Sequence, residues 1–308
     1  MRGPVVSIVG PTASGKSELA EEVALRLGSS VISVDAMQVY RGMDIGTAKT
    51  NVENRRCELE MVDICDISEE YSVQKYQIDA RSCADKILDN GVTPVLCGGT
   101  GLYLNAVIDK MFFPEGSLES SSRIKYQSIL EAEGAEHLHA LLEQRDPESA
   151  QLIHPNNARR TIRALELLDE GVSYAKHHEG LNAREPYYDA RIWGISLDRK
   201  TLYERIEARV DAMMASGLLD EVRGLSDALR ASSTARQAIG YKEMLDYLDG
   251  DVELDEAVEQ VKARTRRYAK RQLSWFGRDG RVRWLDSSLG LDAMADSIVA
   301  DVQPGEPS

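Results

Sequence analysis

The chain has 308 residues, with 51 acidic and 37 basic side chains, which gives a formal net charge of −14. Hydrophobic residues make up 43% of it, enough for a main domain and a smaller second one. No apolar stretch is long enough for a membrane span, and the first residues lack the pattern of a signal peptide. The four cysteines show neither C-x-x-C pairing nor the spacing of a zinc site. These observations predict a cytoplasmic protein with reduced thiols.

The acidic total argues against a nucleic-acid partner, because phosphate groups bind best in a positive field. The basic residues are nevertheless concentrated in three clusters, within residues 159–163, 262–271 and 278–283. A single cluster of this kind is usually a solvated helix face. Three clusters in an acidic chain keep a polyanionic partner open.

The first part of the chain, residues 1–113, alternates between strand and helix patterns. The apolar, β-branched run at residues 4–9 predicts a buried first strand, and the spacing of apolar residues in 18–27 predicts a helix after it. Shorter apolar runs at 31–34 and 94–97 predict two more strands. This alternation predicts a parallel sheet with the active site at the carboxyl ends of its strands.

The strand pattern disappears in residues 114–187, where segments 122–133, 137–144 and 157–168 predict a small helical insertion domain. Residues 188–197 have strand composition again and are expected to complete the sheet. The rest of the third region, residues 188–308, is mostly helical to about residue 276 and ends in a tail that we expect to be flexible. The predicted fold class is therefore α/β, a P-loop NTPase-like parallel sheet core with a helical insertion domain and a helical C-terminal region.

Residues 10–17 match the phosphate-binding pattern G-x-x-x-x-G-K-[ST] and lie between the first strand and its helix. The residues of this loop are Gly10, Pro11, Thr12, Ala13, Ser14, Gly15, Lys16 and Ser17. The glycines let backbone N–H groups point at an anion, Lys16 adds a point charge, and the Ser17 hydroxyl suits Mg²⁺. The alternative is a turn that merely joins strand to helix. The full motif in this context favours a di- or triphosphate site.

The other polar positions follow predicted strands or share a helix face. Asp35 follows residues 31–34 and could hold Mg²⁺ through water, act as a general base, or cap a helix. The sequence Gly98-Gly99-Thr100 follows the later strand, where small residues and a hydroxyl suit close approach of a substrate. Arg205 and Arg209 are four residues apart on a predicted helix, so either could contact a phosphate or form a surface ion pair.

Eight short motifs occur in a characteristic order. They are GPTASGKS at 10–17, SVDA at 33–36, YRGMDIGTAK at 40–49, GGTGLY at 98–103, HPNN at 154–157, RALE at 163–166, RQAIGYK at 236–242 and KRQLSW at 270–275. From about residue 5 to 286 the chain resembles the bacterial tRNA dimethylallyltransferase (tRNA isopentenyltransferase) family. The YRGMDIGTAK stretch is the most specific part. The resemblance does not cover the tail, and we expect no zinc-finger extension of the eukaryotic type.

The resemblance implies transfer of a dimethylallyl group from dimethylallyl diphosphate to the exocyclic N6 amine of the adenine 3′-adjacent to the anticodon in tRNA. Diphosphate leaves, and the P-loop binds this diphosphate rather than ATP. Asp35 is implied as the base that takes the proton of the amine. Lys16, Arg209 and a Mg²⁺ cofactor near Ser17 are implied to stabilise the diphosphate, and Thr12 and Thr100 to hydrogen-bond to it or to the reacting groups.

The resemblance also implies contacts to the anticodon stem-loop of tRNA. Those expected around the target adenine, which must be flipped out of the anticodon loop, are Asp35, Ala36, Met37, Gln38 and Thr100. Those in the insertion domain are Arg123, Arg159, Arg160, Thr161, Ile162 and Arg163. Those expected along the stem are Gln237, Gly240, Tyr241, Lys242, Arg267 and Arg271.

The basic helix from Lys262 is expected to have two different faces. One would carry Arg264, Arg267 and Arg271 toward phosphates, and the other would pack through Val261, Tyr268 and Trp275. The expected partners are tRNA and dimethylallyl diphosphate, with no membrane, and we expect a monomer.

Two alternative functions remain open from the residues. An adenylate isopentenyltransferase would share the P-loop and the aspartate but would prenylate a free nucleotide, which needs neither the insertion domain nor the basic helix. A P-loop small-molecule kinase would share the first hundred residues and would need ATP and a lid with arginines, which residues 159–163 could imitate.

Overall fold

The computed structural model describes residues 2–114 and 120–302. The chain forms two compact units. The larger unit contains the residues up to Ile108 and those from Pro186 onward, and the helical unit contains Asp109–Glu185. The helical unit is thus a single insertion in the chain of the larger one, close to the range 114–187 expected from the sequence.

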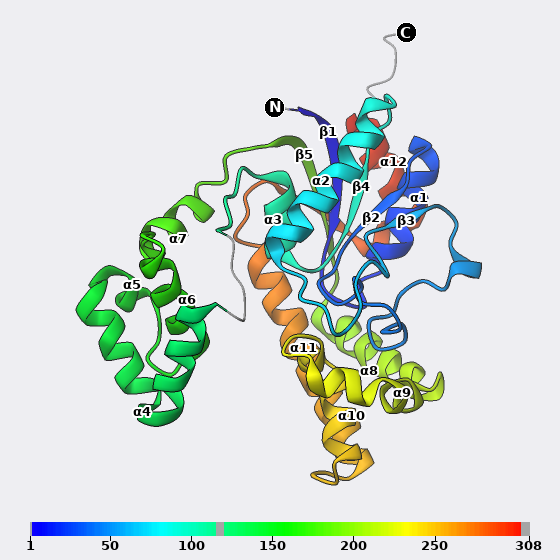
Figure 1. Ribbon diagram of the computed structural model, residues 1–308. Helices are drawn as coiled ribbons and strands as arrows, with labels where there is room; N and C mark the ends of the chain where they lie inside the picture. The colour runs from blue at the N-terminus through cyan, green and yellow to red at the C-terminus, as the bar shows by residue number, and fades with distance from the viewer. Residues whose placement is uncertain (1, 115–119, 303–308) are drawn as a thin grey trace. The chain divides into compact units, whose positions relative to one another are not determined.

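The larger unit is built on a six-stranded parallel sheet with the strand order β3-β2-β4-β1-β5-β6. The strands are β1 (Arg2–Val9), β2 (Val31–Val34), β3 (Leu59–Glu60), β4 (Val95–Gly98), β5 (Tyr188–Ser196) and β6 (Val282–Asp286). The strand that precedes the P-loop, β1, lies between β4 and β5, where the chain order of the sheet changes direction (Figure 1). Ligands of open α/β sheets bind at such a point. The predicted α/β fold class is confirmed.

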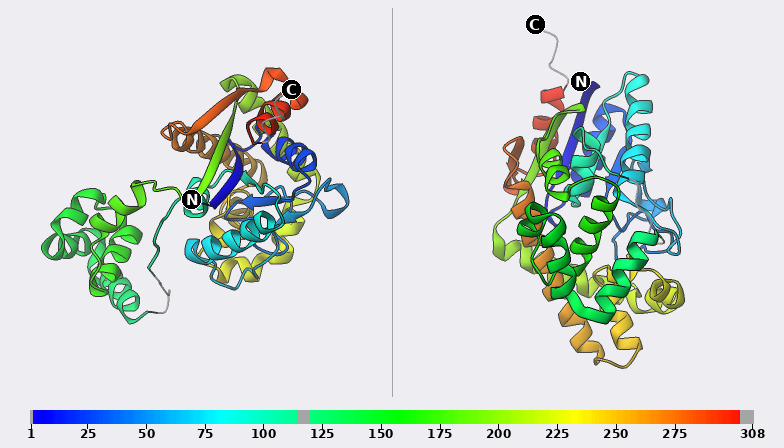
Figure 2. Two further views of the ribbon diagram at one scale, coloured as in Figure 1. Left: turned by 90° about the horizontal axis from the view of Figure 1, so that it is seen from above. Right: turned by 60° about the vertical axis from the view of Figure 1, so that its left-hand side comes forward.

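Helices cover both faces of this sheet. On one face lie α1 (Lys16–Leu27) and α12 (Leu291–Val302), and on the other lie α2 (Val73–Asp89) and α3 (Gly101–Ile108) (Figures 1 and 2). Val6 and Ile8 of β1 belong to the core cluster on the α1 side, whereas Val5 and Val9 belong to the cluster on the other side. Burial on both faces explains why β1 reads as a continuous apolar run.

Four more helices lie at the end of the sheet where its strands finish (Figure 1). They are α8 (Arg199–Ala215), α9 (Leu218–Ala231), α10 (Tyr241–Leu248) and α11 (Leu254–Phe276). Short 3-10 turns occur at η1 (Val52–Asn54), η2 (Ala235–Gln237) and η3 (Ser287–Leu289). Across residues 2–114 and 120–302, no helix is both long and apolar enough to cross a membrane.

The C-terminal region differs from the flexible tail expected after residue 276. Strand β6 pairs with β5 along the edge of the sheet, and α12 buries Met294, Ala295 and Ile298 in the same core cluster as α1. These three residues have helical spacing, but the abundance of Asp and Gly around them hid it. Residues 303–308 lie outside the described residues.

The helical unit contains α4 (Ser121–Arg145), α5 (Pro147–Leu152), α6 (Ala158–Asp169) and α7 (Tyr174–Asn182). Gly134, with a φ of 83°, interrupts α4 where the sequence separates two helical segments. The core of this unit includes Tyr126, Leu138 and Leu165. The expected helices are therefore present.

Candidate active site

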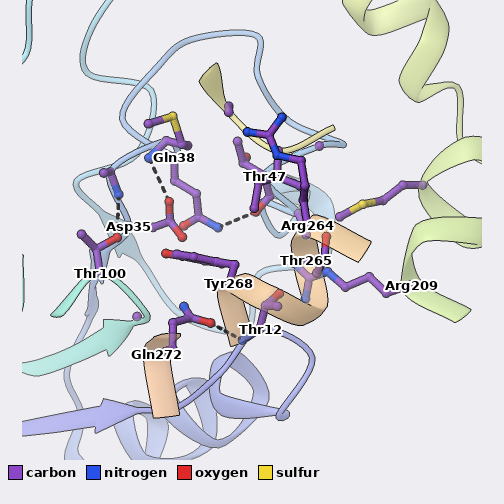
Figure 3. A pocket seen from close by; sticks show the side chains of 18 of the residues that line it. Thr12, Asp35, Gln38, Thr47, Thr100, Arg209, Arg264, Thr265, Tyr268 and Gln272 are labelled. Atoms are coloured by element: carbon purple, nitrogen blue, oxygen red, sulfur yellow. Dashed lines mark hydrogen bonds between the residues drawn. The ribbon is translucent and has the colours of Figure 1, made fainter. Parts of the chain in front are cut away.

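A cavity of about 420 Å³ lies in the larger unit at the carboxyl ends of β1, β2 and β4 (Figure 3). Its lining residues come from the P-loop, the two neighbouring strand ends, α8, the segment before α10, and α11. The members that the sequence predicted are Thr12, Lys16, Ser17, Asp35, Ala36, Met37, Gln38, Thr100, Arg209, Gln237 and Arg271. The structure therefore brings all five predicted catalytic residues, Thr12, Lys16, Asp35, Thr100 and Arg209, together in one site.

The P-loop runs from the end of β1 into the first turn of α1. Gly15 caps this helix with a φ of 89°, a conformation that favours glycine, and α1 begins at Lys16. The Lys16 side chain donates a hydrogen bond to the Pro11 carbonyl (3.0 Å) and lines the cavity. Burial, together with the charge of Arg209, lowers the pKa of Lys16. A bound anion would favour the charged form of Lys16 and so oppose this shift.

Arg209 of α8 provides a second cation at this cavity. No carboxylate of the described residues forms an ion pair with Lys16 or Arg209. Burial lowers the pKa of Arg209, and the charge of Asp35 opposes that shift. Arg205, the alternative one helical turn earlier, is exposed and does not line the cavity. Two cations without carboxylate partners beside a P-loop form an anion site.

Asp35 and Thr100 lie at adjacent strand ends, as the sequence predicted. The N–H of Thr100 donates to the Val34 carbonyl (3.2 Å), and the Thr100 Oγ1 accepts from the N–H of Ala36 (3.2 Å). Asp35 Oδ1 accepts from the N–H of Met37 (2.9 Å), within a turn rather than at the start of a helix. The helix-cap alternative is therefore wrong, and the carboxylate lines the cavity (Figure 3).

A loop of the YRGMDIGTAK stretch forms another wall, through Gly46, Thr47 and Ala48. Glu221 of α9 holds the start of this loop, because its carboxylate accepts from the N–H groups of residues 44, 45 and 46 at 3.1, 2.8 and 3.3 Å. The Tyr241 hydroxyl donates to the same carboxylate at 2.5 Å. The sequence missed Glu221, since no short motif marks it.

Tyr241 and Gly240, which the sequence assigned to tRNA, are buried. A Cβ at Gly46 would overlap the Tyr241 ring, so the tyrosine packs directly under the cavity loop. The Gly240 N–H donates to Glu243 (2.8 Å) at the start of α10. The assignment of these two residues to RNA contact is wrong: they support the loop from inside.

We expect Glu221→Gln to destabilise the protein by about 2 kcal/mol or more, because hydrogen bonds to a charged group contribute about 1.5–3 kcal/mol and the amide turns a donor toward other donors. Denaturant unfolding measures this change. The matched control is Glu204→Gln on the exposed face of α8, which should change stability by less than about 0.5 kcal/mol. Equal stabilities of the two variants would mean that Glu221 does not hold the loop.

Helix α11 supplies the longest wall of the cavity. Its cavity face consists of Val261, Arg264, Thr265, Tyr268, Arg271 and Gln272. Figure 3 shows the Tyr268 side chain reaching into the pocket from α11 toward Asp35. Burial, with the charge of Asp35, raises the pKa of Tyr268 to about 12. The tyrosine therefore stays protonated at neutral pH and can donate a hydrogen bond.

The two faces expected for this helix are partly wrong. Arg264 and Tyr268, placed on opposite faces by the sequence, both line the cavity. Arg264 also forms an ion pair with the buried carboxylate of Glu243. Trp275, expected to pack, packs against Gly101 but is still 42% exposed. The spacing 261, 264, 265, 268 and 272 places these residues on one helical face, but it does not indicate that this face lines a cavity.

Arg267 and Arg271, both predicted to contact RNA, lie in different environments. Arg271 lines the cavity, with its guanidinium 5.5 Å from the centre of the Tyr268 ring. Arg267 is exposed and lines a different hollow together with Arg199 and Lys270. The two arginines thus face different parts of any ligand.

The glycines after β4 leave room for other parts of the protein. A Cβ at Gly98 would overlap the Val34 backbone, one at Gly99 would overlap the Gln272 amide, and one at Gly101 would overlap the Trp275 ring. They leave room for β2 and α11. Gly98 nevertheless lines the cavity, so the interpretation that these glycines allow close approach of a substrate stays a prediction.

The remaining RNA candidates of the larger unit are Gln237 and Lys242. The exposed Gln237 lines the cavity. Lys242 forms an ion pair with Asp246 at 2.7 Å and does not line it.

The residues of the helical unit that were predicted to contact RNA differ in their exposure to solvent. Arg159 and Arg160 at the start of α6 are exposed, and no acidic side chain of the described residues pairs with either. Thr161 and Ile162 are 0% and 2% exposed, so the expectation that their side chains contact tRNA is wrong. The helical period turns these two positions toward the core of the unit.

Arg123 and Arg163 of the helical unit have an internal partner. Both approach the buried Glu166, at 3.2 and 3.6 Å respectively. Arg163 also donates to the Pro114 carbonyl (3.2 Å). They neutralise a buried carboxylate, which leaves Arg159 and Arg160 as the free cations of α6.

The fold and the site define a class of protein. It is a P-loop α/β protein whose phosphate site opens into a cavity lined by residues from helices. The profile of the IPP transferase family matches residues 38–279, more than half of the chain. The tRNA dimethylallyltransferase of Bacillus subtilis is 46% identical over 94% of this chain and 92% of its own. The chain belongs to the IPP transferase family, so the resemblance inferred from the motifs is confirmed.

Solved structures agree with this assignment. The tRNA isopentenylpyrophosphate transferase of Bacillus halodurans has a TM-score of 0.72 at 41% identity, covering 98% of this chain and 96% of its own. A eukaryotic dimethylallyltransferase acting on tRNA has a TM-score of 0.81 at 28% identity, covering 98% of this chain and 79% of its own. These likenesses favour neither the free-nucleotide enzyme nor the kinase.

Proposed function

We propose that this protein transfers a dimethylallyl group from dimethylallyl diphosphate to the N6 amine of the adenine 3′-adjacent to the anticodon in tRNA, releasing diphosphate. The observation that carries the proposal is that one cavity is lined by P-loop residues, by two cations that no carboxylate of the described residues pairs with, and by the Asp35 carboxylate. The names of the relatives supply the two substrates: one half of the cavity suits a diphosphate and the other an amine that must lose a proton.

The diphosphate half of the site acts on the leaving group. As the allylic C–O bond breaks, negative charge grows on the diphosphate oxygen. Lys16, Arg209 and the N–H groups at the start of α1 are fixed at the cavity before the reaction, so they stabilise this charge without reorganisation. Thr12 and Thr100 offer hydroxyl donors beside them.

The carboxylate half acts on the nucleophile. The lone pair of the adenine amine forms the new N–C bond while the C–O bond breaks, and the nitrogen then carries an extra proton. Asp35 accepts that proton, which makes a weakly nucleophilic conjugated amine more effective. Its bond to the Met37 N–H keeps the carboxylate oriented.

A Mg²⁺ ion fits this site only in a particular way. Across the described residues, no group of three or more His, Cys, Asp or Glu side chains is arranged to hold a metal. Ser17 places a hydroxyl in the cavity at the start of α1. Mg²⁺ usually keeps several waters and binds through substrate phosphates, so Ser17 and the diphosphate itself would hold it, and it would add positive charge beside the leaving group.

The target adenine is stacked in an RNA loop and must be extruded to reach the cavity. Thr265 and Tyr268 provide a hydroxyl and an aromatic wall for a flipped base. Arg159, Arg160 and Arg267 are exposed cations suited to RNA phosphates. We further propose that the protein works in the cytoplasm, because its relatives are named for action on tRNA, and that it works as a monomer.

If these arginines meet phosphates, tRNA affinity should fall steeply with salt despite the formal net charge of −14. Arg159→Ala, Arg160→Ala and Arg267→Ala should each reduce the slope of log K against log salt by about 0.7–0.9. Titrations at several salt concentrations measure the slope. Arg230→Ala, which removes a surface ion pair with Asp249, is the control and should leave it unchanged. If no arginine variant alters the slope, these arginines do not contact RNA phosphates and are ordinary solvated surface residues.

The reaction itself is tested by incubating the protein with dimethylallyl diphosphate and tRNA, then digesting the RNA to nucleosides. We expect N6-prenylated adenosine and diphosphate in equal amounts. A tRNA with guanine in place of the target adenine carries an oxygen at C6 instead of the N6 amine and should give no product. Prenylation of that RNA, or diphosphate release without prenylation, would contradict the proposal.

A further inference from the structure

Gln272 connects the two halves of the site, although no motif singled it out as a functional residue. It is only 4% exposed, on the cavity face of α11. Its Oε1 accepts from the Thr12 N–H of the P-loop (2.9 Å), and its Nε2 donates to the Gly99 carbonyl after β4 (3.0 Å). One side chain thus bridges the phosphate loop and the strand end that carries Thr100 (Figure 3).

The two partners fix how the Gln272 amide must point. The amide faces the N–H of Thr12, which can only donate, and the carbonyl of Gly99, which can only accept, so its oxygen faces the P-loop and its nitrogen faces β4. A Cβ at Gly99 would overlap this nitrogen, which means that the glycine leaves the space the amide occupies. Neither Glu nor a hydrocarbon side chain can satisfy both partners.

The bonded amide lies at the edge of the phosphate-binding part of the loop. Thr12 lines the cavity, and Ala13, with a φ of 64°, and Gly15, with a φ of 89°, turn the chain immediately after it. In the described residues, no backbone hydrogen bond outside regular helices and strands uses the N–H groups of Ala13, Ser14 or Gly15. These amides remain available for an anion only if the loop stays curled.

We infer that Gln272 is a positioning residue for the diphosphate, holding the P-loop in its anion-binding curl through the Thr12 N–H and fixing it relative to Thr100. This inference rests on the proposed diphosphate role of the loop. Losing the side chain would leave a donor and a buried acceptor unpaired, and the loop would relax to satisfy them. The usual cost of such unpaired groups corresponds to about a tenfold loss of affinity or more.

The test compares Gln272→Met with Gln260→Met, a control on the exposed part of the same helix, where Gln260 bonds only to Glu256. The measured quantities are the dissociation constants of inorganic diphosphate with Mg²⁺ and of an anticodon stem-loop RNA, and the KM for dimethylallyl diphosphate. We expect Gln272→Met to raise both diphosphate quantities by about tenfold or more while RNA affinity stays within about twofold. The control should change neither.

A parallel loss of RNA and diphosphate affinity, or diphosphate binding equal to the control, would overturn the inference. Should Gln272→Met fail to fold, amide hydrogen exchange in the ligand-free wild type decides. The Thr12 amide should exchange at least about tenfold more slowly than those of Ala13 and Gly15, and equal rates would overturn the inference. A wild type that transfers no dimethylallyl group would instead refute the proposed function, which separates the two failures.

Discussion

Asp35→Asn should lower the turnover number by a factor of about 10² or more while leaving tRNA affinity within a few-fold of wild type. The amide oxygen of asparagine can still accept from the Met37 N–H, so the turn after β2 should persist. The amide cannot take a proton from the adenine amine. Single-turnover kinetics with saturating tRNA and dimethylallyl diphosphate measure the chemical step directly.

The matched control for this variant is Asp66→Asn, which breaks an exposed ion pair with Arg41 outside the cavity. It should turn over like wild type. If Asp35→Asn retained turnover within a few-fold of wild type, Asp35 would only shape the turn and the base would have to be sought elsewhere.

Lys16→Ala should reduce kcat/KM for dimethylallyl diphosphate by about 10² or more, the scale seen when one charge-stabilising group is removed from an active site. Lys16 lines the cavity at the P-loop, and the described residues hold no carboxylate within ion-pair distance of it. Its charge therefore acts on the bound diphosphate. Binding of tRNA, measured without the diphosphate substrate, should change by less than about threefold.

Lys200→Ala, on the exposed start of α8, serves as the control and should alter neither quantity. Equal losses of tRNA binding and diphosphate use in Lys16→Ala would mean that RNA phosphates cross the P-loop, contrary to the proposed division of the site.

Strands β1, β2 and β4 could be predicted because they are buried on both faces and so appear as unbroken apolar runs, whereas the edge strands β3 and β6 are only partly buried and show no such run. The meeting of Asp35 and Thr100 followed from one rule, that parallel strands end at the same edge. Helix α12 was missed because it lies in a C-terminal stretch rich in Asp, Gly and Pro, which indicated a tail, and because only packing against α1 shows that its apolar residues form a core face.

The candidate site was predictable where backbone topology decides it and not where side-chain direction does. Arg264 and Tyr268 both have amphipathic side chains, so the spacing of residues along α11 alone does not indicate which face of the helix lines the cavity. Thr161, Ile162 and Tyr241 lie within or beside recognisable motifs yet point inward. Glu221 and Gln272 act on backbone groups far away in the chain, which a sequence pattern does not reveal.

The most direct test of the proposed function supplies the protein with three sets of substrates: radiolabelled dimethylallyl diphosphate with tRNA, the same diphosphate with AMP, and ATP with bulk tRNA but no prenyl donor. If the protein transfers a dimethylallyl group to tRNA, we expect label in the tRNA alone, no labelled AMP, and no ATP hydrolysis above background. Label in AMP would identify an enzyme of free nucleotides, and ATP turnover without a prenyl donor would identify a phosphoryl-transfer enzyme; either result would contradict the account.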